Sequence, residues 1–358
     1  MRTGNLIYAS DKAVKDALIQ HKFTKSDLKE IFLSRGILVS NETEREELAL
    51  YFSRLNHDYY DHKLLSSVLG VSSRREKTSI TNVNNVITSD AVEKIMHKIK
   101  EDQSNEGDEA SVKLTNNGAE IKLKYTQIDY NKSEFKQVVE KEAIISIEIK
   151  KDGLAIRYPL NDYIGNVKNS LLDEVSKEIE EDEVLVVDEL ELRDIVSAKD
   201  RTSFFTALIK HMPNYILYDV SDVYVYHPKE FQEEDDLGVH ISKATLKGEG
   251  VLESSELKSL YKKGFYIWKI RWTAKGGSYD SDLYEFEAQF SDAENCSKFS
   301  YLICGFYKYK SDKVFVSSKK AVPSIEEVRL GKLIEDAAQL SRKELELKKE
   351  KEMPDEDK

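Results

Sequence analysis

Three residues in the middle of the chain have the side chains that a metal-dependent hydrolase uses. Asp129 precedes a strand-like segment in which Glu148 and Lys150 are separated by a single residue. Residues two apart in a strand share a face, so Glu148 and Lys150 point the same way. Two carboxylates could hold Mg²⁺, and the lysine could steady the attacking water and the developing charge.

This layout resembles that of magnesium-dependent nucleases of the PD-(D/E)xK type, and the resemblance implies cleavage of a nucleic acid. Residues 144–150, however, belong to a predicted hairpin whose turn contains Asp152 and Gly153. Charged residues on one face of an antiparallel strand are typical of its solvated side. We therefore keep a metal-dependent nuclease as an alternative and predict neither a metal nor another cofactor.

Two further constellations lack the partners that their chemistry requires. The run 184–187 followed by Asp188 and Glu189 is similar to the metal-and-water strand of nucleotide hydrolases, but no GxxxxGK[ST] accompanies it. It predicts a buried strand that runs into a helix. His57/Asp61 and Asp58/His62 are spaced i, i+4 on a predicted helix. Each pair supplies two ligands, whereas a metal site needs three or four.

The segment 23–77 contains the residues that suggest a molecular partner. Thr24 and Asp27 are spaced as a helix N-terminal cap, an apolar face follows at 28, 31 and 32, and Gly36 ends the helix. The order of helix, Arg-Gly, apolar turn and second helix resembles the SAP-type DNA-binding motif. The matching positions are Leu28, Leu33, Gly36, Ile37 and Leu48. Where that motif usually has a basic residue leading its second helix, this chain has glutamates.

Residues 64–75, LLSSVLGVSSRR, are similar to the turn of a helix-turn-helix. A small residue, then Gly70 four positions later and Val71 next, is what two closely crossing helices require. The resemblance implies that Ser72 caps a recognition helix, although Glu76 stands where such a helix normally buries an aliphatic residue. The residues that it places toward the groove are Ser73, Arg74, Arg75 and Lys77.

Charge is unevenly distributed along the chain. Residues 1–100 carry 16 Lys and Arg against 13 Asp and Glu, whereas the whole chain has a net charge of −12. A phosphate backbone is therefore favoured only at the N-terminal end. The alternative for residues 23–77 is a helical bundle that packs against the rest of the chain or against a partner.

Composition excludes several classes of protein. With 40% hydrophobic and 34% charged residues the chain is globular, not disordered. No apolar run approaches the ~20 residues that span a bilayer, and residues 1–20 lack the apolar core of a secretory signal. Cys296 and Cys304 are the only cysteines, eight apart and without a CxxC, so neither a disulfide framework nor a structural zinc site is indicated. We expect a cytoplasmic protein that does not contact membranes.

The patterns predict an α+β fold. We expect a helical domain over 1–100, an acidic linker over 101–110, a small hairpin-plus-helix domain over 111–181, an antiparallel β-rich domain with flanking helices over 182–340, and a charged tail over 341–358. Asn117-Gly118 and Asp152-Gly153 predict two hairpin turns. Alternation places Trp268 and Trp272 on one face of a strand and Lys269 and Arg271 on the other.

The aromatic residues of the C-terminal part could stack on bases as single-strand binders do. These residues are Tyr215, Tyr224, Tyr226, Trp268, Trp272, Tyr284, Phe286, Tyr301 and Phe306. Because such binders line a basic groove and this half of the chain is acidic, the core of a sheet explains the aromatics better.

We therefore expect a non-catalytic DNA-binding protein whose C-terminal half contacts another protein, with RNA as an alternative ligand. The residues expected to meet phosphates are Lys22, Lys25, Lys29 and Arg35, and those nearest the bases are Arg74, Arg75 and Lys77. A different class of function, an adaptor subunit of a multi-protein assembly, is the second alternative.

Overall fold

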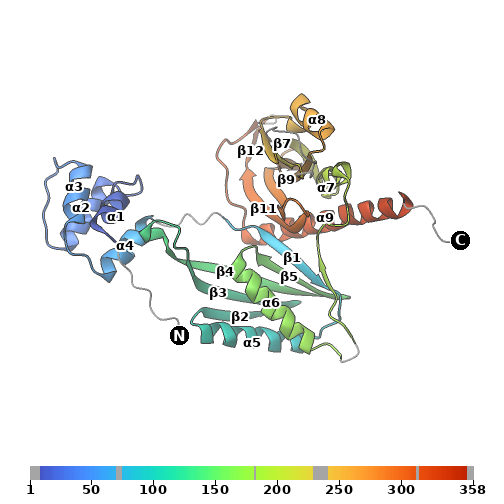
Figure 1. Ribbon diagram of the computed structural model, residues 1–358, viewed down its shortest axis with the longest axis horizontal. Helices are drawn as coiled ribbons and strands as arrows, with labels where there is room; N and C mark the ends of the chain where they lie inside the picture. The colour runs from blue at the N-terminus through green and yellow to red at the C-terminus, as the bar shows by residue number, and fades with distance from the viewer. Residues whose placement is uncertain (1–8, 70–74, 181–182, 229–240, 312–313, 353–358) are drawn as a thin grey trace, which may run out of the picture. The chain divides into compact units, whose positions relative to one another are not determined.

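The computed structural model describes residues 9–69, 75–180, 183–228, 241–311 and 314–352 (Figure 1). These residues form two compact units, between which the chain passes several times. The first unit contains the described residues up to Leu69, with 93–115 and 119–144. The second contains 75–92, 116–118 and the described residues from Ile145 onward.

Four short helices build the core of the first unit. They are α1 (Asp11–Leu18), α2 (Lys25–Ser34), α3 (Arg45–Ser53) and α4 (Tyr59–Leu69). The expected cap of α2 is confirmed: the Asp27 backbone N–H donates to Thr24 Oγ1, and the Asp27 carboxylate accepts from the Thr24 N–H. Phe23, Phe32 and Phe52 are buried among the four helices.

The rest of the first unit consists of most of α5 (Ser89–Glu106), strands β2 (Glu109–Thr115) and β3 (Gly118–Ile128), a 3₁₀ turn (Glu134–Lys136) and the first half of β4 (Val138–Lys150). The expected linker over 101–110 is therefore mostly helix and strand. Lys98 Nζ lies 2.7 Å from Asp102 Oδ1, and Gln103 is buried. An acidic run continues a helix when a lysine one turn earlier offsets its charge.

The second unit is built on an antiparallel sheet with the strand order β4-β5-β1-β11-β10-β9-β7-β8, while β6 pairs separately with β1. The strands are β1 (Thr78–Val83), β5 (Gly153–Pro159), β6 (Val187–Glu189), β7 (Tyr215–Tyr226), β8 (Lys243–Lys247), β9 (Tyr266–Gly276), β10 (Leu283–Asp292) and β11 (Ser297–Tyr307). A two-stranded ribbon, β12 (Tyr309–Ser311) and β13 (Val314–Phe315), follows. The central strand β1 came from a polar stretch, TSITNV, that the sequence did not mark as a strand.

Both predicted hairpins are present. In the β4–β5 hairpin, Lys150 is paired with Gly153. Gly153 has φ +152°, and a Cβ there would lie 1.8 Å from the carbonyl oxygen of Val83 in β1. Only glycine lets β1 approach this turn so closely.

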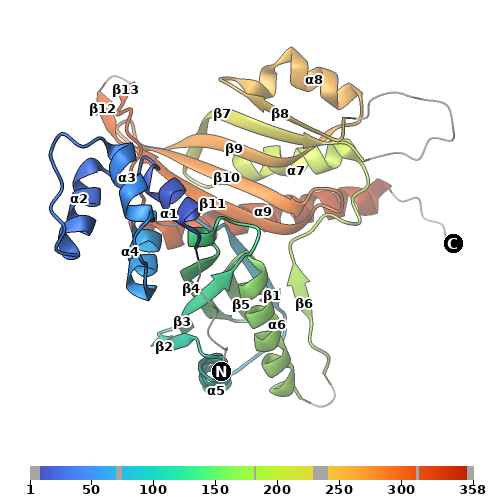
Figure 2. The ribbon, with the colours of Figure 1, turned by 60° about the vertical axis from the view of Figure 1, so that its left-hand side comes forward.

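Two helices pack on one face of the sheet at strands β9 and β11. They are α7 (Ala198–Lys210) and α9 (Ser324–Glu352), which contact each other (Figure 2). Helix α6 (Asp162–Lys177) lies on β5, and α8 (Ser255–Lys262) follows a 3₁₀ turn (Val251–Glu253). Phe204, Trp272, Phe290 and Ile334 are fully buried between the layers. The expected charged tail is helical as far as Glu352, because α9 continues through it and buries Leu345.

The α+β class, with a helical N-terminus and a β-rich C-terminal part, is confirmed. The expectation of a buried strand that runs into a helix at 184–189 was wrong: a strand forms at 187–189, but its neighbouring valines are exposed, and irregular residues separate it from α7. In the described residues, no helix is both long enough and apolar enough to cross a bilayer.

Candidate functional site

The sheet of the second unit has a charged face opposite α7 and α9. In Figure 2 these helices lie behind strands β9–β11, and no described element of the second unit lies in front of these strands. Lys247, Asp222, Arg271 and Glu287 are partners across β8, β7, β9 and β10. We call the polar face the set Lys77, Asp222, Tyr224, Lys243, Lys247, Trp268, Lys269, Arg271 and Glu287.

Three cations of the polar face converge on one carboxylate. Glu287 accepts from Lys77 Nζ at 2.6 Å, Lys269 Nζ at 3.0 Å and Arg271 Nη2 at 2.6 Å. Its side chain is 3% exposed. Burial alone would raise the pKa of Glu287, but the bonds from Lys77, Arg271 and Lys269 lower it to about 2. Glu287 therefore stays ionised and holds the three cations together.

The polar face keeps more positive than negative charge. Asp222 lies 3.7 Å from Arg271 Nε and 3.6 Å from Lys247 Nζ. Four cationic side chains, those of Lys77, Lys247, Lys269 and Arg271, thus share two carboxylates. Lys77, Lys269 and Arg271 are 16–32% exposed, so a second anion can reach them without unfolding the cluster.

Two aromatic rings lie beside these cations. Lys269 Nζ lies 4.5 Å from the centroid of Tyr224, and Trp268 packs 6.0 Å from the same ring. Lys243 Nζ lies 5.3 Å from the Trp268 centroid. A register shift places Ile267 and Lys269 opposite consecutive residues of β7. Trp268 is the extra residue of this bulge, which breaks the expected alternation with Trp272.

The turn and the first part of the predicted recognition helix, residues 70–74 with Ser73 and Arg74, lie outside the described residues. Residues 75–77 are irregular and lead into β1, because Ser79 onward pairs with β5 in the sheet. Arg75 donates to the Ile303 carbonyl oxygen at 2.9 Å and to the Glu327 carboxylate. Lys77 is part of the polar face, so the structure places these two residues in the second unit.

The remaining predicted contact residues lie in the first unit. Arg35 donates to Asn56 O at 2.7 Å and to the Asp61 carboxylate, with its guanidinium over the ring of Phe52. Lys29 donates to Asn41 Oδ1 at 2.5 Å, and Lys22 donates to the Leu69 carbonyl. Lys25 is half-buried at the start of α2. Residues 9–69 hold nine Lys and Arg against ten Asp and Glu, so these helices are not cationic overall.

The three residues of the nuclease-like pattern bond to other side chains of the protein and do not lie together. Glu148 accepts from Arg157 Nη1 at 2.7 Å with one oxygen and from Lys332 Nζ at 2.6 Å with the other. Lys150 donates to Asn82 Oδ1 at 3.2 Å. Asp129, in the first unit, pairs with Lys132 at 3.4 Å. Among the described residues no three His, Cys, Asp or Glu side chains are grouped as metal ligands.

Neither cysteine is an activated nucleophile, and His57 and His62 contact other groups of the first unit. Burial raises the pKa of Cys296 to about 12 and that of Cys304 to about 11, so both thiols stay protonated. His57 packs on Phe52 and lies 3.8 Å from Asp61, whereas His62 stacks on Phe135. These contacts give both histidines a structural role in the first unit.

The sequence pattern indicated several residues of the polar face, but not that they lie next to one another. The alternation of β9 pointed to Lys269 and Arg271, and Tyr224 and Trp268 were among the aromatics considered for stacking. Lys243 and Lys247 were missed, since β8 is short and lies at the edge of the sheet. No protein-family model matches this chain, and a search of curated proteins found no similar sequence.

Proposed function

We propose that this chain is a non-catalytic DNA-binding protein and that the polar face receives a single strand of DNA. The observation that supports the proposal is the convergence of Lys77, Lys269 and Arg271 on the carboxylate of Glu287, with Asp222 as the second carboxylate of the polar face. Phosphate oxygens accept bonds from such ammonium and guanidinium groups, and each contact releases a counterion.

The neighbouring rings suit a single strand better than a duplex. Tyr224 and Trp268 are half-buried next to Lys269 and Lys243. Unpaired bases stack on aromatic side chains while the backbone follows the cations, and this mode is tolerant of sequence. RNA has the same phosphates and bases of similar shape, so single-stranded RNA is the comparison ligand.

The test is fluorescence anisotropy of the full chain with labelled single-stranded DNA, single-stranded RNA and duplex DNA. We expect single strands to bind more tightly than the duplex. Affinity should fall about twentyfold between about 50 and 200 mM salt, because about three phosphates are neutralised. An affinity that does not change with salt would contradict the proposal.

Charge-reversal variants locate the interface. Lys243→Glu/Lys247→Glu should weaken single-strand binding by about tenfold. Lys262→Glu/Lys263→Glu changes the net charge equally at exposed residues at the end of α8, and it should leave affinity near that of the parent. Equal losses in the two variants would overturn the assignment to the polar face.

The helices of the first unit supply the competing interface. Lys25→Glu/Lys29→Glu reverses two charges on α2 (Lys25–Ser34). A loss confined to this variant would keep DNA binding but move it to α2. We expect little change, because the glutamates around α3 already oppose phosphate there.

The proposal also includes a protein contact through the C-terminal half of the chain. What supports it is a group of exposed valines next to β6, where Val184 is 79% exposed and Val186 is 48% exposed. Exposed apolar surface of this kind favours a protein partner, as an adaptor subunit would also have.

A further inference from the structure

Strand β6 leaves one of its edges open. The Asn84 N–H donates to Val186 O at 2.9 Å, and β6 continues this antiparallel pairing, with Asn82 opposite Asp188. In such a ladder, alternate residues bond to the partner strand. Leu185 and Val187 therefore direct their backbone N–H and C=O groups away from β1. Within the described residues no backbone hydrogen bond uses these groups.

This edge is held in an extended conformation. The side chain of Asn85 donates to Val184 O at 3.1 Å and accepts from the Val186 N–H at 2.8 Å. Arg342 of α9 donates to Asp188 Oδ1 at 2.6 Å and to Glu189 O at 3.2 Å. A pre-formed edge costs little entropy when another strand pairs with it.

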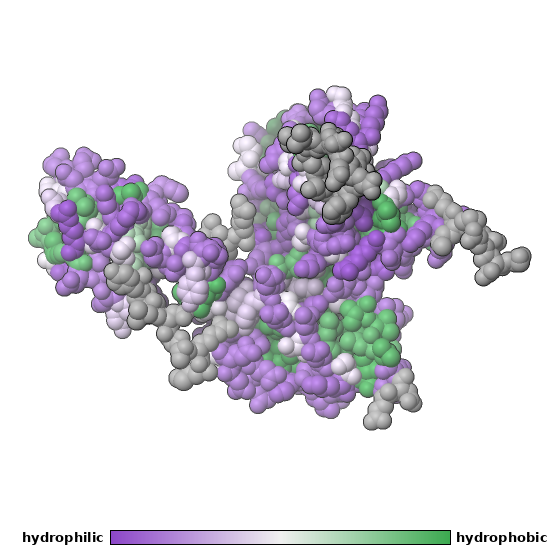
Figure 3. All heavy atoms as spheres, viewed as in Figure 1, coloured by the Kyte–Doolittle hydropathy of each residue, from purple (hydrophilic) through white to green (hydrophobic). Residues whose placement is uncertain are grey.

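The side chains at this edge are apolar and exposed. Val86 is 76%, Val184 79%, Val186 48% and Val187 39% exposed. Figure 3 shows hydrophobic surface in this part of the second unit, where β1 ends and the segment before β6 begins. β-Branched residues on an open edge are the usual template for adding a further strand.

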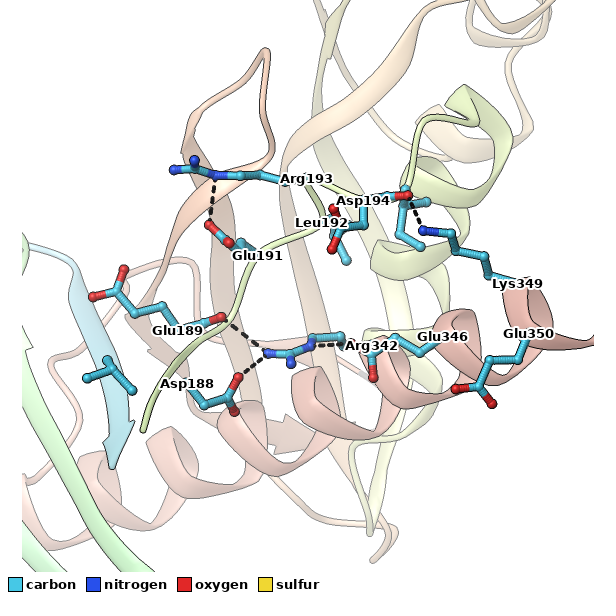
Figure 4. Close-up of a pocket in the computed structure, with 12 residues that line it drawn as sticks. Asp188, Glu189, Glu191, Leu192, Arg193, Asp194, Arg342, Glu346, Lys349 and Glu350 are labelled. Carbon is cyan, nitrogen blue, oxygen red and sulfur yellow. Dashed lines mark hydrogen bonds and ion pairs between the residues drawn. The ribbon is translucent and has the colours of Figure 1, made fainter. Parts of the chain in front are cut away.

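An acidic cavity of about 400 Å³ continues from this edge. It lies between residues 187–195 and the C-terminal half of α9, and Figure 4 shows Arg342 and Lys349 reaching across it. Its charged lining is Asp188, Glu189, Glu191, Asp194, Glu346 and Glu350 against Arg193, Arg342 and Lys349.

Two of these carboxylates have no cationic partner within the described chain. Lys349 donates to the backbone oxygen of Asp194 at 3.0 Å and not to its carboxylate, which forms no ion pair with any described residue. Glu350 is likewise in no ion pair among the described residues, whereas Arg342 is shared by Asp188 and Glu346. The cavity therefore complements a cation.

We propose that β6 binds an extended segment of another protein, with alternating apolar residues on the strand edge and a Lys or Arg side chain in the acidic cavity. This inference rests on the protein-contact part of the proposed function and is independent of the polar face. The carboxylates exclude nucleic acid here, and the backbone groups of Leu185 and Val187 require a partner that offers its own backbone.

The probe is a fluorescein-labelled peptide of alternating valine and threonine with one central lysine, compared with the same peptide carrying norleucine in place of lysine. We expect the full chain to bind the lysine peptide at micromolar concentration and the norleucine peptide about tenfold more weakly. No binding of either peptide would overturn the proposal.

Two protein variants separate the edge from the cavity. Val187→Pro removes the outward N–H while keeping the ladder to β1, and it should weaken both peptides. Asp194→Asn/Glu350→Gln should weaken only the lysine peptide. Glu253→Gln/Glu256→Gln, exposed residues by α8, is the matched control and should bind as the parent does. Unchanged binding in both test variants would contradict the assignment.

Two further measurements complete the test. Single-stranded DNA binding should be the same in Val187→Pro as in the parent, so failure of the peptide site and failure of the polar face are distinguishable. Analytical ultracentrifugation should show the same mass for the parent and for Val187→Pro. Self-association that the proline abolishes would make the occupant a second copy of this chain and overturn the proposal.

Discussion

Two ionic clusters of the second unit use similar groups for different purposes. Beneath α9, Arg157 bonds Glu335 in three contacts of 2.7–2.9 Å and Glu148 at 2.7 Å, and Tyr301 donates to Glu335 at 2.7 Å. With Lys332, the two cations match the two carboxylates. On the polar face, Lys77, Lys269 and Arg271 share Glu287.

The difference shows what charge balance decides. The cluster under α9 is neutral and closed, so it fastens the helix to β5 and β11 and has no capacity for another ion. The polar face is cationic and partly exposed, so its groups can serve an external anion as well as Glu287. A close ion pair alone therefore says little about function. What matters is whether the cluster has an excess of positive charge and whether its cations are exposed to solvent.

The largest expected effect is on the closed cluster. Glu335→Ala leaves Arg157, which is 15% exposed, without its main partner. Arg157 and Lys332 then share the single carboxylate of Glu148, and this loss of one partner from a buried ion pair should lower the free energy of unfolding by about 3–5 kcal/mol. Urea unfolding followed by circular dichroism measures this. A loss below about 1 kcal/mol would mean that water replaces the carboxylate and that the cluster is not closed.

The second effect is the acid sensitivity that Glu287 confers. Its pKa is about 2 in the folded chain, below the ordinary 4.5, so its ionised form stabilises the fold above pH 4.5. That stability is lost as the pH falls from 4.5 toward 2, on the order of 3 kcal/mol in all. Glu287→Gln should flatten the pH dependence of unfolding by this amount. Parallel curves for parent and variant would contradict the pKa shift.

Glu287→Gln should also strengthen binding of single-stranded DNA, since it frees three cations from their shared carboxylate. We expect affinity to rise about threefold at low salt, equivalent to roughly 0.6 kcal/mol. Glu335→Gln, under α9, is the matched neutralisation and should leave affinity as it is. Equal effects of both variants would erase the contrast between the clusters.

The smallest effect is expected at the rim of the closed cluster. Lys332 is 44% exposed and pairs only with Glu148 in the described contacts. Lys332→Ala should change the free energy of unfolding by about 0.5 kcal/mol or less. A larger loss, measured in the same urea titration, would show that the rim contributes as much as the buried centre around Glu335.

The sequence predicted correctly those features that depend on residues close together in the chain. The Thr24–Asp27 cap and the turns at Asn117-Gly118 and Asp152-Gly153 depend on residues a few positions apart, and all are present. The strand TSITNV was missed because its polar residues are satisfied from afar: Ser79 donates to Phe299 O, and Thr81 lies 3.2 Å from the Tyr158 hydroxyl.

The candidate site was predictable only in part. Alternation in β9 placed Lys269 and Arg271 on one face, but their partner Glu287 is in another strand. Lys77 was expected on a recognition helix, and it instead bonds Gln289, 212 positions away. The open edge of β6 was not predictable for the same reason: VLVV is typical of a buried strand, and no neighbouring residue indicates that β1 is the single strand paired with it in the described chain.

The sequence by itself determined the elements: caps, hairpin turns, apolar helix faces and the α+β class, all of which arise from interactions between neighbours in the chain. Only the tertiary structure decided which charges are neutralised and which remain. Ion pairs join residues that sheet pairing and helix packing bring together over long separations. The function of each cation therefore depends on the fold, not on its flanking residues.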